Sequence, residues 1–218
     1  MTPQEVAVLD YGSQYSQLIV RRVRELGFAS HLYPPAELAN LQSPGAIILS
    51  GGPRSTTEKD APDVDYEKLM SFGVPVLGVC YGMQLLNIKH GGTVKPGVTR
   101  EYGPAKLVVT DHEDLFAGIS HESQVWMSHS DTCANLANTT KVIATNEDAV
   151  PVALKWSDRC WGIQFHPEVT RLTMHRWGVI GAHRFVLPNT AIPEYITNCC
   201  QAIIDHWISL GGDPERYQ

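Results

Sequence analysis

The stretch GVPVLGVCYGMQLLNIKHGG, residues 73–92, decides the expected fold of this chain. Its first part is a run of small apolar residues that predicts a buried strand, and the part after Cys80 has the spacing of a helix. Cys80 lies between Gly78 and Gly82, where the strand changes into the helix. A sharp strand-to-helix turn brings the backbone close to itself and requires small flanking residues. The pattern is therefore that of a nucleophile elbow, G-x-S-x-G, with cysteine in place of serine.

Strand and helix signals alternate through the first half of the chain. The short strands of the second half follow one another closely, which indicates antiparallel pairs, and the chain reads as helical again from about residue 190. The sequence predicts an α/β fold, an open and mostly parallel sheet with flanking helices and a small antiparallel addition, in a single domain over 1–218. The expected strands are 6–12, 28–34, 44–53, 74–80, 105–110, 123–129, 140–146, 150–156 and 160–166, and the expected helices are 15–26, 66–73 and the one that begins after Cys80.

Composition narrows the class of protein. The chain has 218 residues, of which 43% are hydrophobic, and a net charge of −6, which argues against a nucleic-acid-binding face. No apolar run approaches the roughly 18–20 residues that span a membrane, and the N-terminus lacks the features of a signal peptide. The five cysteines are dispersed without a C-x-x-C pair, so we expect a reducing, cytoplasmic location and no metal site. The basic cluster at 21–27 is expected to be a solvated helix face.

The position of Cys80 suits a nucleophile. Ligands of open α/β sheets bind at the carboxyl ends of the strands, and Cys80 lies at such an end. The N-terminus of the following helix favours a thiolate, and the N–H of Tyr81 is expected next to the reacting centre, where it can stabilise an oxyanion. The alternative is a buried structural cysteine beside two packing glycines.

A thiol nucleophile requires a base and a group that orients the base. In GIQFHPEV, residues 162–169, a strand is expected to end at His166, and Glu168 follows two positions later on the same side of an extended segment. Pro167 cannot donate a ladder hydrogen bond, which places the strand end here. The alternative is a surface histidine with a nearby glutamate.

The third motif is ILSGGP, residues 48–53, in which two glycines follow a buried strand. They allow backbone N–H groups to face a ligand, and Gly52 is the expected second oxyanion donor. A phosphate-binding loop is the rival interpretation, but Pro53 removes an N–H and Arg54 replaces an acid. An ordinary tight turn is the third interpretation.

Taken together, these motifs resemble the triad-type, class I glutamine amidotransferases over about residues 5–170, which implies a flavodoxin-like sheet. Three further stretches, LDYGSQYSQLIVRRVRELG (9–27), TREYG (99–103) and VWMSHSD (125–131), are similar to the amidotransferase domain of GMP synthetases. The resemblance implies that glutamine is hydrolysed to glutamate and ammonia, without a cofactor in this chain. The ammonia would pass to an ATP-pyrophosphatase synthetase subunit, to which ATP and Mg²⁺ would belong.

The resemblance also implies a role for each site residue. Cys80 would be the nucleophile, His166 the base and acid, and Glu168 the residue that orients His166. Gly52 and Tyr81 would supply the oxyanion N–H groups. The substrate glutamine would be bound by Gln84, Ser128, His129 and Ser130.

Two departures from the family pattern leave alternatives open. Ser130 stands where the family usually has glycine; if the position needs a positive φ, serine costs about 1 kcal/mol in strain. Residues 171–218 diverge from the expected continuation and are predicted to form an extension with a terminal helix, in which 174–190 is the candidate gate of the active site. A stand-alone hydrolase of a γ-glutamyl compound and a non-catalytic regulator on the same fold are therefore the alternative functions.

Overall fold

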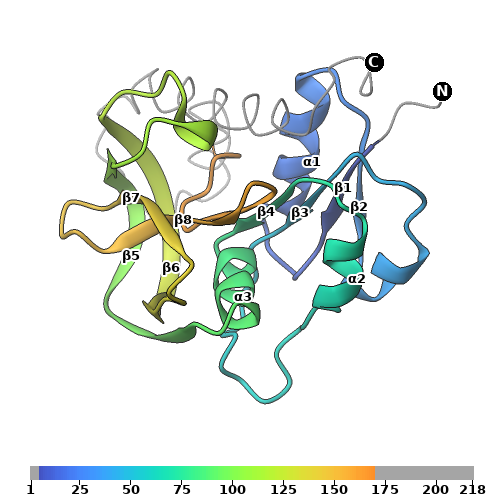
Figure 1. The fold of residues 1–218 in the computed structure, drawn as a ribbon, viewed down its shortest axis with the longest axis horizontal. Helices are drawn as coiled ribbons and strands as arrows, with labels where there is room; N and C mark the ends of the chain where they lie inside the picture. Colours follow the sequence, from blue (N-terminus) through green and yellow to red (C-terminus); the bar gives the residue numbers. More distant parts are fainter. Residues whose placement is uncertain (1–4, 170–218) are drawn as a thin grey trace, which may run out of the picture.

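The computed structural model describes residues 5–169, which form one mixed sheet with helices on both faces (Figure 1). The predicted divergent extension, its terminal helix and the candidate gate at 174–190 lie outside the described residues. The strands are β1 (Val6–Leu9), β2 (Ser30–Tyr33), β3 (Ala46–Leu49), β4 (Val76–Val79), β5 (Thr93–Val109), β6 (Glu122–Asn135), β7 (Lys141–Thr145), β8 (Pro151–Ser157) and β9 (Cys160–Ile163). The helices are α1 (Ser16–Glu25), α2 (Tyr66–Ser71) and α3 (Tyr81–Lys89), with 3₁₀ turns at Pro35–Asn40 and Asp114–Phe116.

The strand order is β2-β1-β3-β4-β9-β8-β7-β5-β6. The first five strands in this order, β2, β1, β3, β4 and β9, pair in parallel. The pairs that involve β8, β7, β5 and β6 are antiparallel. The parallel part has the 2-1-3-4-5 order of flavodoxin-like sheets, because β9 occupies the fifth place. The predicted α/β class and the antiparallel addition are confirmed.

Alternation along β1 shows why both faces of the sheet are covered. Val6 and Val8 belong to a core cluster that includes residues of α1, whereas Ala7 and Leu9 belong to a second cluster that includes residues of α3. Figure 1 shows α1 on one side of the sheet and α2 and α3 on the other. A strand that is buried on both faces requires a continuous apolar run, and this is what the sequence of β1 and β3 provides.

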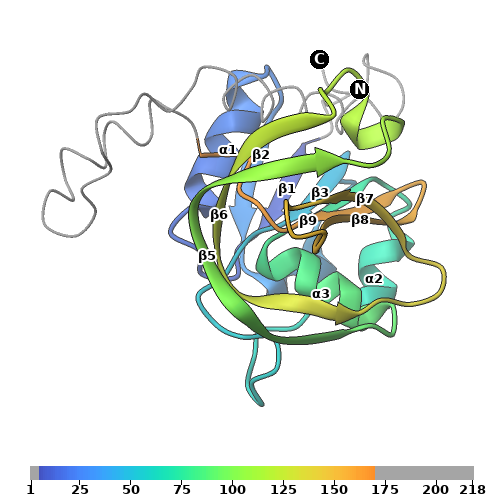
Figure 2. The same ribbon diagram turned by 90° about the vertical axis from the view of Figure 1, so that its left-hand side faces the viewer.

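The antiparallel addition differs from the expectation in the lengths of β5 and β6. β6 continues to Asn135, beyond the predicted strand at 123–129. β5 begins at Thr93, well before the predicted strand at 105–110, and pairs with β6 along most of its length. Figure 2 shows the two as long curved strands that run side by side. A register shift between Pro96 and Glu101 interrupts the pairing. The early part of β5 contains Pro96 and Gly97, which disfavour strands, so only the pairing with β6 makes this segment extended.

The parallel strands end at one edge of the sheet. The carboxyl end of β4 leads to Cys80, that of β3 to the Ser50–Gly52 loop, that of β1 to Asp10, and that of β9 to His166. The three predicted motifs therefore meet there.

Candidate active site

Cys80 lies in a strained turn. Its φ of 53° and ψ of −104° are unusual for a residue other than glycine, and it is the N-cap of α3. A Cβ on Gly78 would lie 2.5 Å from the Gly82 carbonyl carbon, and one on Gly82 would lie 2.4 Å from the Leu49 oxygen. Both positions therefore exclude side chains, as the elbow pattern predicts. Such backbone strain costs about 1–3 kcal/mol and is retained where the surrounding structure enforces it.

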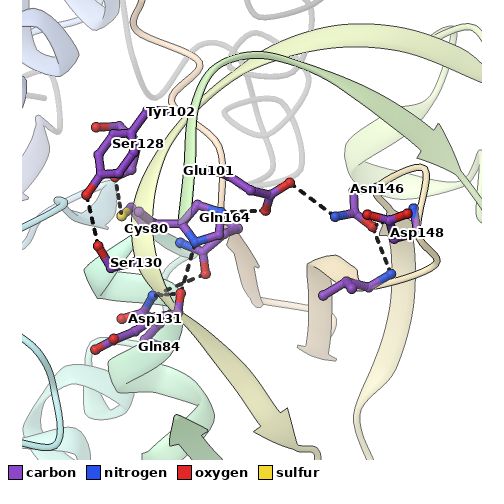
Figure 3. Close-up of polar contacts among 12 residues, drawn as sticks. Cys80, Gln84, Glu101, Tyr102, Ser128, Ser130, Asp131, Asn146, Asp148 and Gln164 are labelled. Carbon is purple, nitrogen blue, oxygen red and sulfur yellow. Dashed lines mark hydrogen bonds and ion pairs between the residues drawn. The ribbon is translucent and has the colours of Figure 1, made fainter. Parts of the chain in front are cut away.

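Backbone hydrogen bonds hold the elbow against both neighbouring strand ends. The N–H of Cys80 donates to the Ile163 oxygen at 2.8 Å, and the N–H of Gly82 donates to the Ser50 oxygen at 3.1 Å. The Cys80 thiol is 3.8 Å from the Ser128 oxygen of β6, as the close-up in Figure 3 shows. The thiol lines a cavity of about 580 Å³ at the carboxyl edge of the sheet.

His166 and Glu168 are in direct contact, but not for the reason that the sequence suggested. β9 ends at Ile163, three residues before His166, so the prediction that the strand ends at His166 is wrong. The N–H of Val169 donates to the His166 oxygen at 3.2 Å, which closes a turn with Pro167 and Glu168 at its centre. This turn brings Nδ1 of His166 to 2.6 Å from Oε1 of Glu168. Both side chains are buried.

The charge state of His166 follows from its surroundings. Burial lowers the pKa of His166, but the Glu168 carboxylate and the neighbouring Cys80 raise it, and the net result is a pKa well above the ordinary value. Because Nδ1 is directed at Glu168, Nε2 is the nitrogen left for the thiol. The protonated imidazole of His166 therefore lies beside the sulfur of Cys80.

Two side chains that the sequence interpretation missed surround this pair. The ring of Tyr15 lies edge-on to the His166 ring, with centroids 4.9 Å apart. Arg22 is buried, and its Nε donates to the backbone carbonyl oxygen of Glu168 at 3.4 Å. The expectation of a solvated face at 21–27 is therefore wrong for Arg22, because α1 packs over the turn that contains Glu168. Helical spacing could have distinguished Arg22 from Arg21, because Arg22 lies three residues after the buried Ile19 on the same side of α1.

Gly52 and Tyr81, the expected oxyanion donors, both line the cavity beside Cys80. Within residues 5–169, neither backbone N–H donates to another group. A Cβ on Gly52 would lie 2.7 Å from the Tyr11 oxygen, and one on Gly51 would lie 3.1 Å from Cε1 of His166. The backbone of Tyr11 therefore excludes a side chain at Gly52, whereas a side chain at Gly51 would require the His166 ring to shift by a few tenths of an ångström.

The four expected glutamine-binding residues, Gln84, Ser128, His129 and Ser130, line the same cavity. Nε2 of Gln84 donates to the backbone carbonyl oxygen of Asp131 at 2.9 Å and to Oε1 of Gln164 at 3.2 Å (Figure 3). Both of its N–H groups are therefore occupied, and only its carbonyl oxygen is left for a ligand.

Ser130 is not strained. The non-glycine residues with positive φ among 5–169 are Ser43, Cys80, Asp114 and Ala149, so the strain considered for Ser130 does not occur. Ser130 continues β6, and its hydroxyl is 2.9 Å from the hydroxyl of Tyr102, which is 60% exposed and lines the cavity. Figure 3 shows this contact at the wall beside Cys80.

His129 forms a second histidine–carboxylate pair. Its Nδ1 is 3.0 Å from the backbone oxygen of Asp131, and its Nε2 is 2.9 Å from Oε2 of Glu101. The other carboxylate oxygen of Glu101, Oε1, accepts from Nδ2 of Asn146. Burial lowers the pKa of His129, and the carboxylate of Glu101 only partly opposes this. The pair connects β5 to β6 and joins the cavity wall to the β7–β8 turn.

Other kinds of site are not found in the part of the chain that the structure describes. Over residues 5–169, no group of three or more His, Cys, Asp or Glu side chains is arranged to hold a metal ion. In the same range no helix has the length and apolar character needed to cross a membrane. The three cysteines described there, Cys80, Cys133 and Cys160, are free thiols.

Comparison with known proteins decides the family. The model of the class-I glutamine amidotransferases matches residues 7–176. The chain belongs to this family. It is 50% identical over 171 residues to a GMP synthase (glutamine-hydrolyzing) of Thermosipho africanus, an alignment that covers 76% of this chain and 33% of the relative. It is 39% identical over 220 residues to the corresponding enzyme of Latilactobacillus sakei, covering 95% of this chain and 42% of the relative.

This amidotransferase thus spans about a third to two fifths of the length of these curated relatives. Among solved structures, a glutamine amidotransferase of Thermotoga maritima has the same fold, with a TM-score of 0.78 and 20% identity. That match covers 96% of this chain and 100% of the other. The flavodoxin-like fold expected from the sequence is confirmed.

Proposed function

We propose that this chain hydrolyses glutamine to glutamate and ammonia through a thioester on Cys80, as the glutaminase part of a GMP-synthetase type system. The observation that carries the proposal is the contact of His166 with Glu168 at 2.6 Å beside the strained Cys80, at one end of a cavity. The names of the curated relatives, GMP synthase (glutamine-hydrolyzing), support both the substrate and the type of system.

The first half-reaction follows from the positions of the three side chains. The Cys80 thiolate attacks the side-chain carbonyl carbon of glutamine, and the carbonyl π electrons move to oxygen. The N–H groups of Gly52 and Tyr81 stabilise this oxyanion, and each such donor contributes on the order of 3 kcal/mol in comparable sites. Nε2 of His166 gives its proton to the departing nitrogen, the C–N bond breaks, and ammonia leaves a γ-glutamyl thioester on Cys80.

The second half-reaction reverses the roles of His166. Neutral His166 takes a proton from water, and the hydroxide attacks the thioester carbon. The C–S bond breaks, glutamate leaves, and the thiolate is restored beside an imidazolium that Glu168 stabilises. One amide and one water are consumed, and one glutamate and one ammonia are released. The ammonia is used by an ATP-pyrophosphatase synthetase, which would bind ATP and Mg²⁺.

A glutaminase assay tests this proposal. The full chain should release equal amounts of glutamate and ammonia from glutamine, alone or with the ATP-pyrophosphatase part of a GMP synthase added. Cys80→Ser should abolish the release, whereas Cys133→Ser, at another buried cysteine, should retain it. Hydrolysis of γ-glutamyl peptides without any turnover of glutamine would favour the stand-alone hydrolase instead, and equal turnover by Cys80→Ser would exclude the thioester.

A further inference from the structure

A buried network of hydroxyl groups lies beneath the Gly51–Gly52 loop, and the mechanism above does not use it. Oδ1 of Asp10 accepts from the Ser16 hydroxyl at 2.7 Å and from the Gly12 N–H at 2.9 Å. Oγ of Ser16 is 3.1 Å from Oγ of Ser50. Ser16 is 1% exposed and Ser50 is completely buried. Two segments that are far apart in the sequence, 10–16 and the loop that begins at Ser50, meet at this network.

The hydroxyl of Ser50 contacts the loop itself. It accepts from the Tyr11 N–H at 3.0 Å and donates to the Gly51 oxygen at 2.9 Å. The Gly51 carbonyl and the Gly52 N–H belong to the same planar trans peptide, in which C=O and N–H point in opposite directions. A hydrogen bond that holds the carbonyl toward the protein interior therefore holds the N–H on the opposite side of the peptide.

The protons of the network can be assigned. A hydroxyl has one proton to donate, and the shorter contact of Ser16 is the one to the Asp10 carboxylate. Ser16 thus gives its proton to Asp10, and its lone pairs face Ser50. The Tyr11 N–H donates a hydrogen bond to the Ser50 oxygen. The Ser50 hydroxyl keeps its own proton to donate, and the Gly51 oxygen at 2.9 Å is a closer acceptor than Ser16 Oγ at 3.1 Å.

The loop needs such support. With no side chain at Gly51 or Gly52, the backbone dihedrals on both sides of this peptide are freer than those of any other residue type. Rotation of the peptide plane would turn the Gly52 N–H away from the cavity and leave a carbonyl oxygen near the developing oxyanion. A Cβ at Gly52 would lie 2.7 Å from the Tyr11 oxygen, so that position admits no side chain and the restraint has to come from a neighbouring residue.

We propose that Ser50 is a positioning residue for glutamine hydrolysis: its hydroxyl, held by the Tyr11 N–H, fixes the Gly51–Gly52 peptide with the Gly52 N–H directed at the oxyanion. The inference rests on the proposed function. It predicts that Ser50 affects the tetrahedral state and not the reactivity of the thiol.

Two probes of Cys80 separate these effects. The Cys80 thiolate adds to the aldehyde carbon of glutamate γ-semialdehyde. The product is a hemithioacetal whose oxyanion lies at the Gly52 N–H. Iodoacetamide alkylates the same sulfur by displacing iodide and forms no oxyanion. The variants are Ser50→Ala and Ser50→Cys, because cysteine fills a similar space but is a weak donor. Ser30→Ala is the matched control, since Ser30 is equally buried and its hydroxyl has no partner within residues 5–169.

Removing an oxyanion donor lowers kcat about 10²–10³-fold. Leaving the donor in place without its restraint should lower kcat less, about tenfold. We therefore expect Ser50→Ala and Ser50→Cys to bind the semialdehyde about tenfold more weakly and to lose about tenfold in kcat. The rate of alkylation by iodoacetamide and the KM for glutamine should stay as in the wild type. Ser30→Ala should match the wild type in every measurement.

The outcomes are distinct. Wild-type semialdehyde affinity in both Ser50 variants would overturn the inference, and so would a loss in Ser50→Ala that Ser50→Cys restores, because that pattern reports packing. If Ser50→Ala does not fold, Ser50→Cys decides alone. Failure of the wild-type chain to bind the semialdehyde would instead count against the proposed glutaminase.

Discussion

His166 and Glu168 are joined at 2.6 Å across a turn that contains Pro167, so the pair is formed within four consecutive residues. What the turn cannot supply is the placement of the pair against Cys80. That placement comes from the hydrogen bond of the His166 N–H to the Trp126 oxygen at 2.8 Å and from the parallel pairing of β4 with β9. The local pair and the distant Cys80 can therefore be tested separately.

Removing His166 should affect turnover more than neutralising Glu168. His166→Ala loses both proton transfers, each of which contributes about 10²–10⁴-fold, so kcat should fall at least that far. Glu168→Gln keeps the shape of the side chain and loses only its charge, so its loss should be smaller. Ammonia release at saturating glutamine measures both, and wild-type turnover in His166→Ala would contradict the proposed mechanism.

The pH profile of Glu168→Gln has a predicted direction. In the wild type the carboxylate raises the pKa of His166, so the imidazolium keeps its proton to higher pH than an ordinary histidine. Without that charge the pKa falls, and the acid that protonates the leaving group is lost at lower pH. The alkaline limb of kcat against pH should therefore move to lower pH in Glu168→Gln. A limb that stays in place or moves upward would show that Glu168 does not stabilise the imidazolium.

A glutamine-analogue alkylator such as a diazo-ketone should label one cysteine of the chain, Cys80. Burial raises the pKa of Cys133 to about 12 and that of Cys160 to about 12, so neither is a thiolate near neutral pH. Peptide mapping by mass spectrometry locates the label, and added glutamine should protect against it. A label on Cys133 or Cys160 with Cys80 unmodified would refute the assignment of the nucleophile.

The contact of Ser130 with Tyr102 should act in glutamine binding as a single unit. Each of Ser130→Ala and Tyr102→Phe removes the same hydrogen bond, which at this exposed position contributes about 0.5 kcal/mol. We expect each variant to raise the KM for glutamine about twofold, and the double variant to raise it no further. Tyr66→Phe is the control, because the Tyr66 hydroxyl contacts His90 and not the cavity. Fully additive effects would show that the two hydroxyls act independently.

Arg22 should stabilise the turn that contains Glu168, and Arg21 offers a matched comparison. Both arginines contact Glu25, but only Arg22 is buried and donates to the backbone carbonyl oxygen of Glu168. Arg22→Met should lower the free energy of unfolding by about 1–3 kcal/mol, the cost of leaving buried groups unpaired, and should lower kcat. Arg21→Met should change the unfolding free energy by less than about 0.5 kcal/mol. Equal effects in denaturant titrations would contradict this role for Arg22.

The sequence by itself determined the features that depend on neighbouring residues. The elbow at Cys80 requires a small residue two positions before it and another two positions after it, and Gly78 and Gly82 meet that requirement. The contact of His166 with Glu168 depends on a turn of four residues. The alternation of apolar strands and helices predicted a mostly parallel sheet, and the carboxyl ends of parallel strands necessarily meet at one edge.

Only the tertiary structure decided which other side chains reach that edge. Helical spacing places Arg22 on the apolar side of α1, but only the packing of α1 over the Glu168 turn shows that it contacts Glu168. The sequence left open whether Ser130 needs a positive φ, and its place in β6, where φ is not positive, decides that it does not. Ser50 reads as the end of a strand, yet its hydroxyl donates to the Gly51 oxygen and accepts from the Tyr11 N–H, which arrives from another strand end. Contacts between segments so far apart leave no periodic pattern in the chain, because they depend on the order and spacing of the strands in the folded sheet.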